Sequence, residues 1–232
     1  MIFSKYGINA RIAPAILCAV PFLVLYYWYL SPYLSGMFSF FGDLKIISDI
    51  SFPVLLIFLL AQINRHVSKV LFQKFYFKEE LYMPTTNFLL YSDNHYTKQY
   101  KDDFRDKVFT DFNIKLPKEP EEMKNELFAR QRIVEAMSLV RKKCEKSKIL
   151  LQHNIEYGFF RNLIGGSVIA APLSLIFTIY CYVFIHNTTA TISLGLCFIL
   201  FSLLILFSKN LITEYGKAYA KILFQEYILL KI

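Results

Sequence analysis

The chain has 232 residues, of which 55% are apolar and 17% aromatic, and its mean hydropathy is +0.38. Soluble domains of this size are more polar, so the composition excludes an ordinary globular protein and indicates a membrane protein. The net charge of +8 does not indicate nucleic-acid binding, because residues 65–161 hold 19 of the 26 basic and 14 of the 18 acidic residues, a surface of mixed sign.

Two apolar segments precede this polar region. The first, residues 12–30, has 19 residues without a charge, enough for a helix to cross a hydrocarbon core of about 30 Å. We expect Pro14 to lie in its first turn and Pro21 to kink it. The second segment covers residues 46–63. Residues 1–63 are therefore predicted to form a transmembrane hairpin.

Two further apolar segments follow the polar region, at residues 163–185 and 192–208. A short uncharged stretch joins them, and Lys209 follows the second. Their lengths again suit helices that cross a bilayer. We predict a second transmembrane hairpin over residues 163–208.

The basic residues near the four predicted spans indicate their orientation. The connections within the two hairpins contain one lysine between them, Lys45. The other flanks hold Lys5, Arg11, Arg65, Lys69, Lys74, Lys78, Arg161, Lys209, Lys217 and Lys221. Because flanking basic residues stay on the cytoplasmic side, both termini and the polar region are predicted to be cytoplasmic.

Two amphipathic stretches mix aromatic residues with lysine, as helices at the level of the lipid headgroups do. They cover residues 67–77 and 219–232, and each follows an even-numbered span. We therefore expect the cytoplasmic domain, residues 64–162, to begin with an interfacial helix. Residues 209–232 are expected to form an interfacial tail.

The rest of the polar region is predicted to be helical. Residues 96–112 carry apolar side chains at a spacing of three to four, and Pro117 and Pro120 end this element. From Glu121 the pattern predicts a long helix with an apolar stripe formed by Leu127, Val134, Met137, Cys144, Leu151 and Ile155. The face opposite this stripe, with Arg130, Arg141, Lys142 and Lys146, is expected to be solvated.

Catalytic and metal-binding motifs are absent from the sequence. It contains no GxSxG, HExxH or phosphate-loop pattern, and its four cysteines and four histidines lack the spacing of a zinc site. We therefore predict that the protein is not an enzyme and that it uses no cofactor or metal.

Asp49 is the acidic residue inside a predicted span. A carboxylate within a bilayer is costly and suggests an ion or proton path. Asp49 also lies a few residues from the outer end of its span, where it could reach interfacial water. Both interpretations remain open.

The segment that joins the polar region to the third span contains Glu156, Tyr157, Gly158, Arg161 and Asn162. Aromatic and basic residues suit an interfacial junction. A signal from the polar region would also have to pass through this segment. The sequence allows a purely structural role and a coupling role.

Two motifs carry a resemblance to a known class of protein. Met83-Pro84-Thr85-Thr86 is followed by Leu89 and Asp93, and Glu156-Tyr157-Gly158-Phe159 is followed by Arg161-Asn162-Leu163. This pattern resembles small bacterial membrane effectors of anti-phage systems, including retron-associated ones. The resemblance implies an inner-membrane protein that compromises the membrane and stops the host when triggered.

Together these features predict an all-α integral membrane protein, with four transmembrane helices in two hairpins and a helical cytoplasmic domain inserted between them. Small residues of the third span, Gly165, Gly166, Ala170 and Ala171, and the apolar stripe suggest a homo-oligomer. Expected partners are the bilayer and a cytoplasmic protein or nucleoprotein regulator. The predicted function is a triggered membrane-perturbing effector. The alternatives are a constitutive channel or carrier and a scaffold that recruits a soluble partner.

Overall fold

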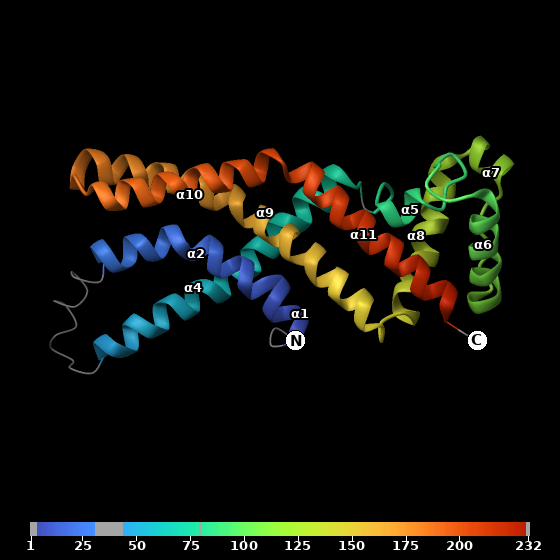
Figure 1. The fold of residues 1–232 in the computed structure, drawn as a ribbon, viewed down its shortest axis with the longest axis horizontal. Coiled ribbons are helices and arrows are strands. Elements are labelled where there is room, and N and C mark those ends of the chain that lie inside the picture. Colours follow the sequence, from blue (N-terminus) through green and yellow to red (C-terminus); the bar gives the residue numbers. More distant parts are fainter. Residues whose placement is uncertain (1–3, 31–43, 79, 231–232) are drawn as a thin grey trace. The chain divides into compact units, whose positions relative to one another are not determined.

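The structure is a computed structural model, and it describes residues 4–30, 44–78 and 80–230. Helices make up almost all of this part of the chain, and it contains no strand, so the all-α prediction is confirmed (Figure 1). Four of its helices are long and apolar enough to cross a membrane, namely Lys5–Trp28, Ser51–Phe72, Lys148–Ile185 and Thr188–Leu206. The prediction of four spans is therefore confirmed at the level of length and composition.

The first span is helical from Lys5 to Leu30, in four consecutive pieces. These are α1 (Lys5–Gly7), η1 (Ile8–Ile12), α2 (Ala13–Leu25) and η2 (Tyr26–Leu30), where η denotes the wider π-helical turns. The hydroxyl oxygen of Ser4 caps the first turn by accepting from the Gly7 amide at 3.1 Å. Because the helix begins seven residues before the predicted start, Pro14 lies inside it, and its expected place in the first turn is wrong.

The second span extends past its predicted end. Helix α4 (Leu44–Ser68) continues directly into η4 (Lys69–Tyr76), with Pro53 inside α4. The stretch expected to form a separate interfacial helix is thus part of this longer helix. Its Phe72 is fully buried within the protein.

The third and fourth spans also belong to longer helical runs. Helix α9 (Lys148–Tyr180) continues into η5 (Cys181–Ile185). Helix α10 (Thr188–Leu206) is followed after a single residue by α11 (Ser208–Leu229). The Asn187 side chain caps α10 by accepting from the Ala190 amide at 3.0 Å.

The chain forms two compact units. We call residues 1–69 and 158–209 the span unit, and residues 70–157 and 210–232 the polar unit. Each long helix α4–η4, α9–η5 and α11 contributes residues to both. From residue 210 onward, the predicted tail therefore belongs with the polar region in the structure.

Small apolar residues bring the helices of the span unit together. Ala15 and Ala19 of α2 pack on Leu60 and Ala61 of α4. Another cluster joins α2, α9 and α10 through Cys18, Leu163, Ala170, Ala171 and Phe201. The small residues that suggested a homo-oligomer are thus buried within one chain, and the oligomer remains a prediction without that support.

The polar unit is built from short helices around one apolar core. They are α5 (Pro84–Asn87), α6 (Lys98–Phe112), α7 (Glu119–Lys124) and α8 (Glu126–Lys143). Helix α6 matches the predicted helix at residues 96–112, and its Phe104 and Val108 are fully buried. Thr97 caps α6 by accepting from the Tyr100 amide at 3.3 Å.

The prediction of a single long helix from Glu121 is wrong. Asn125 leaves the helical conformation and caps α8 by accepting from the Phe128 amide at 3.1 Å, and Ser147 caps α9 through the Leu150 amide at 3.1 Å. These polar side chains offer the backbone an alternative to helix continuation. The breaks rotate the apolar stripe, so Leu127 is 54% exposed. The buried face of α8 is Ala129, Ile133, Ala136, Met137 and Val140.

The prediction of a solvated basic face is wrong for Arg130. Its guanidinium donates to the Leu81 carbonyl at 2.8 Å and to Asn87 Oδ1 at 2.7 Å, and it pairs with Glu126 at 2.7 Å. The side chain is 10% exposed. Arg141 is likewise engaged, through an ion pair of 2.8 Å with Glu80.

The C-terminal helix α11 completes the core of the polar unit. Its Ala220, Leu223, Phe224 and Tyr227 are fully buried among residues of α6 and α8. The Phe224 ring stacks on Phe104 with centroids 4.5 Å apart. The structure therefore differs from the expected interfacial tail, because the apolar face of this helix is covered by protein.

A buried carboxylate ties α11 to the rest of the core. Asp111, whose side chain is 3% exposed, pairs with Lys143 at 2.6 Å and accepts from the Tyr227 hydroxyl at 2.7 Å. Burial raises the pKa of this carboxyl, but the contacts with Lys143 and Tyr227 outweigh it and hold the pKa below its ordinary value. The stabilisation is therefore present above the unfolded-state pKa of about 3.9 and is lost as the pH falls through the lower folded-state value.

We predict that Asp111→Asn loosens α11 at neutral pH, because it leaves Lys143 without its anionic partner. Such a loss costs about 1–3 kcal/mol, so amide hydrogen exchange in residues 220–229 should accelerate roughly tenfold or more. Glu135→Gln, which removes an exposed pair with Arg132, is the control and should leave exchange in this helix unchanged. Equal exchange rates in the wild type and Asp111→Asn would contradict the assignment.

Candidate functional site

A polar cluster lies buried where three helices of the span unit meet. It begins with Pro14, which has no N–H and so cannot bond to the carbonyl of Ala10, four residues earlier. Asn162 of α9 supplies the missing donor, and its Nδ2 lies 2.5 Å from that carbonyl oxygen. Asn162 is 1% exposed. The amide therefore satisfies a backbone group that the first helix leaves open.

The same side chain also joins the second span. The Ser68 hydroxyl at the end of α4 lies 3.0 Å from Asn162 Oδ1, and 3.0 Å from the carbonyl of Arg65 in its own helix. Ser68 is fully buried. Asn162 thus bridges the first and second spans from its position at the start of the third.

Glycines allow this close approach. A Cβ placed on Gly165 would lie 2.7 Å from the Asn64 carbonyl oxygen and 2.8 Å from the Ser68 nitrogen, both backbone atoms of α4. A Cβ on Gly166 would lie 2.5 Å from Asn64 Nδ2 and 2.5 Å from Cys18 Sγ. We call Ala10, Asn64, Ser68, Asn162, Gly165 and Gly166 the Asn162 cluster.

Asn64 is the least satisfied member of the cluster. It is 1% exposed. Apart from the Cys18 thiol, its amide has no hydrogen-bond partner among the described residues. Cys18 in turn lies 3.8 Å from the carbonyl of Leu163. A buried amide without full hydrogen bonding is costly. The arrangement therefore contains a polar group that would gain from a rearrangement of the helices.

The chemistry of the Asn162 cluster is that of a helix clamp. Its polar side chains are two amides and a hydroxyl, which do not titrate near neutral pH. These side chains therefore offer no acid, base or activated nucleophile. Among the described residues, no group of three or more histidine, cysteine or acidic side chains could hold a metal ion. Interhelical hydrogen bonds and close glycine contacts hold membrane helices together.

The predicted junction residues divide between the two units. Gly158 and Asn162 pack in the span unit, where a Cβ on Gly158 would lie 2.8 Å from the Tyr6 hydroxyl. Arg161 is half-buried in the same unit. Glu156 belongs to the polar unit and pairs with His153 at 3.5 Å, and Tyr157 lies near Gly216. The structure therefore does not bring these five residues into one site.

The Pro84-Thr85-Thr86 motif has a structural place in the polar unit. All three residues are buried in α5. Thr86 donates to the Glu80 carbonyl at 2.9 Å, and Thr85 accepts from Arg141 at 3.3 Å.

Asp93, the last residue of this motif, anchors the loop before α6. Its carboxylate accepts from the His95 amide at 2.8 Å, and its carbonyl accepts from Lys101, which is buried. Burial lowers the pKa of Lys101. Asp49 lies in the second turn of α4, and its side chain is outside the described residues.

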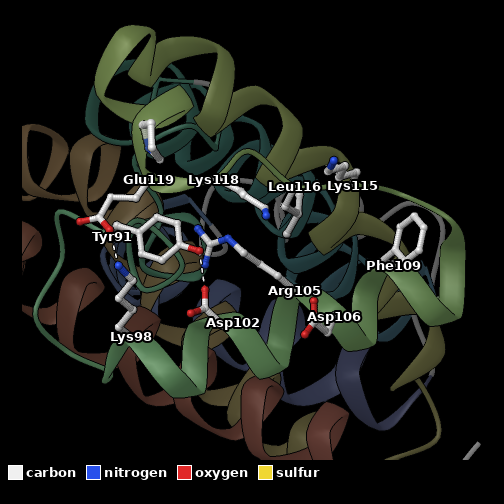
Figure 2. Close-up of a pocket in the computed structure, with 11 residues that line it drawn as sticks. Tyr91, Lys98, Asp102, Arg105, Asp106, Phe109, Lys115, Leu116, Lys118 and Glu119 are labelled. Atoms are coloured by element: carbon white, nitrogen blue, oxygen red, sulfur yellow. Dashed lines mark hydrogen bonds and ion pairs between the residues drawn. The ribbon is translucent and has the colours of Figure 1, made fainter.

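The polar unit also contains a cavity of about 680 Å³ between α6 and the loop before α7. Figure 2 shows that Tyr91 and Arg105 lie at its centre, with Lys98 and Glu119 at one end and Phe109 at the other. The lining residues are Tyr91, Lys98, Asp102, Arg105, Asp106, Phe109, Lys115, Leu116, Lys118, Glu119 and Pro120. Its size is typical of small-molecule sites.

Hydrogen bonds fix the centre of the cavity. The Arg105 guanidinium lies 4.0 Å from the Tyr91 ring centroid, and the Tyr91 hydroxyl donates to Asp102 at 2.5 Å. Burial and this hydrogen bond raise the pKa of Tyr91 to about 12, so the phenol stays neutral at pH 7. Buried Glu122 accepts from the amides of Tyr91 and Ser92, each at 3.1 Å. The centre of the cavity is therefore preorganised.

The sequence analysis singled out Asn162 but missed its partners and the cavity. Asn64 and Ser68 were placed beyond the end of the second span, because the helix was expected to stop at residue 63. A detectable signal was Pro14, since a proline inside a helix leaves a carbonyl that another side chain can satisfy. The cavity gives no local signal, because its residues come from three separate segments.

Comparison with protein-family models, with curated proteins and with solved structures found no match.

We predict that Gly165→Ala separates α9 from α4, because the added methyl group meets backbone atoms that cannot rotate away. Cys18 should then react with N-ethylmaleimide roughly tenfold faster in detergent-solubilised protein, as expected for a loss of about 1–3 kcal/mol of packing. Peptide mass spectrometry reads each cysteine separately.

Two comparisons make this measurement specific. Gly195→Ala is the matched control, because the nearest atom to its Cβ is Thr178 Cγ2 at 3.9 Å. Cys181 is fully buried in another cluster and reports general unfolding. A Cys18 rate that stays at the wild-type value, or rises only together with that of Cys181, would refute the clamp.

Proposed function

We propose that this protein is a bacterial inner-membrane effector of anti-phage defence, whose spans perturb or permeabilise the bilayer when its cytoplasmic domain is triggered. The observation that carries the proposal is the continuous helix Lys148–Ile185. Its 38 residues would extend about 57 Å, nearly twice the thickness of a hydrocarbon core. A large part of this helix therefore has to lie outside the bilayer.

This helix contributes to both hydrophobic cores. Leu150 is buried in the core of the polar unit, and Leu163 is buried in the core of the span unit. No helix break separates them. A shift of the polar-unit end would therefore move the third span, which supports a coupling role for the junction.

The Asn162 cluster supplies a resting state that such a shift could release. An interhelical hydrogen bond in a membrane protein contributes about 1 kcal/mol, so the bonds from Asn162 contribute a few kcal/mol at most. Binding of a trigger can supply a difference of about 5.5 kcal/mol between two states and reverse their populations. The clamp is thus strong enough to hold a closed bundle and weak enough to be released.

The hydroxyl groups of the third span favour an effector over a constitutive channel. Ser167 and Ser174 are fully buried, and each donates to the carbonyl four residues earlier in α9, at 2.8 and 2.6 Å. Thr178 does the same at 2.7 Å. Their donors are thus occupied within one helix, and water would have to compete with these bonds.

We predict that releasing the clamp depolarises bacterial cells without a trigger. Gly165→Ala should lower the membrane potential, read by a voltage-sensitive dye during controlled expression, and should stop growth within the same period. The wild-type chain at equal expression should depolarise cells less, because its clamp is intact. Gly195→Ala is the matched control and should behave as the wild type.

The outcomes separate the three candidate functions. Normal potential and growth with every variant, including Gly165→Ala, would refute the effector and leave the scaffold. Equal depolarisation by the wild type and Gly165→Ala, abolished by Asp49→Asn, would favour the constitutive channel or carrier.

Localisation provides a further test. With both termini and the polar unit cytoplasmic, a reporter enzyme that is active only outside the inner membrane should be inactive when fused after Leu230. The same reporter inserted between His186 and Asn187 should be active, because this connection is predicted to face outward. The reverse pattern would overturn the assigned orientation.

A further inference from the structure

The cavity of the polar unit presents two cationic side chains on one loop. Lys115 and Lys118 lie three residues apart in the segment before α7 and line the cavity, and no ion pair of either occurs among the described residues. Lys98, by contrast, pairs with Glu119 at 2.5 Å. The two ammonium groups are therefore available to an anion inside the cavity, and phosphate is a strong acceptor for such donors.

Arg105 adds positive charge at the centre of the cavity. Its side chain is 7% exposed, and its nearest acidic partner, Glu122, lies at 3.9 Å, a long distance for an ion pair. The Nε atom of Arg105 is buried and has no hydrogen-bond partner among the described residues. In Figure 2 the Lys118 side chain extends toward Leu116, and the guanidinium lies beside Tyr91 and Asp102. Positive charge from the loop and from α6 thus lines the same cavity.

The other end of the cavity suits a flat, polar ring. Phe109 is 51% exposed although it lines the cavity, and Leu116 beside it is buried. An exposed aromatic face is a stacking platform for a base. Figure 2 places Asp106 between Arg105 and Phe109. Its carboxylate can accept a hydrogen bond from an amino or hydroxyl group of the bound molecule.

We infer that this cavity binds a nucleotide, with the phosphates at Lys115, Lys118 and Arg105 and the base on Phe109. The volume of about 680 Å³ fits one small molecule. Asp102, Asp106 and Glu119 also line the cavity, so its basic residues do not form the continuous basic stripe of a nucleic-acid groove. A nucleotide bound here would be a ligand of the polar unit that biases the proposed effector, and this last step rests on the proposed function.

Binding is tested with the full-length protein purified in detergent. Titration calorimetry with ATP, GTP, CTP and UTP, in EDTA, should show saturable binding of at least one. Inorganic phosphate and the corresponding nucleoside should each bind at least tenfold more weakly, because each lacks half of the contacts. No binding of any nucleotide, or phosphate that binds as tightly as the nucleotide, would overturn the inference.

Variants locate the site. Lys118→Gln should weaken binding of the nucleotide roughly tenfold and reduce its dependence on salt, and Phe109→Ala should weaken it without changing the salt dependence. Lys118→Arg should retain most of the affinity. Lys124→Gln is the matched control, since this exposed lysine of α7 does not line the cavity. Unchanged affinity in both Lys118→Gln and Phe109→Ala would place the nucleotide elsewhere and refute the inference.

The binding measurement and the depolarisation measurement test separate claims, and either claim can be refuted alone. If no nucleotide binds while Gly165→Ala still depolarises cells, the effector stands and the nucleotide site is wrong. If a nucleotide binds in the cavity while no variant depolarises cells, the site stands and the effector is wrong. The link between the two requires that Lys118→Gln suppresses depolarisation by the wild-type chain and leaves that of Gly165→Ala intact.

Discussion

The hydrogen bond from Asn162 to the carbonyl of Ala10 is the contact on which the span unit depends. Pro14 creates the need for it, because a backbone acceptor inside an apolar bundle has no water to bind. Once Asn162 occupies that position, Ser68 is drawn to its oxygen, and the glycines that follow allow α4 to approach the same helix. The carbonyl that Pro14 leaves open thus lies where three helices meet.

Periodicity and charge predicted much of this architecture. The four spans, the helix at residues 96–112 and its buried Phe104 follow from apolar runs and from spacing along a helix. These features are local, and a sequence displays local features directly. The helix breaks at Asn125 and Ser147 are also local, but they depend on polar side chains that compete for backbone groups, which an apolar pattern does not reveal.

The candidate sites were far less predictable because their partners are distant in the chain. Asn162 lies 152 residues from Ala10 and 94 from Ser68. The position of α11 could not be predicted either, since an amphipathic helix at a membrane surface and one in a protein core have the same sequence pattern. Only the presence of α6 and α8 decides between them. Arg130 was misplaced for the same reason, because its acceptors, Leu81 and Asn87, come from another segment.

The place of α11 in the polar core has a consequence for the order of synthesis. Leu223, Phe224 and Tyr227 follow both of the later spans in the chain, so they leave the ribosome after those spans do. Residues 70–157 therefore cannot complete their core while those spans are still being inserted. For the effector proposed above, a polar unit that matures only after membrane insertion would give a nascent chain no means of responding early, and this would protect the cell that produces it.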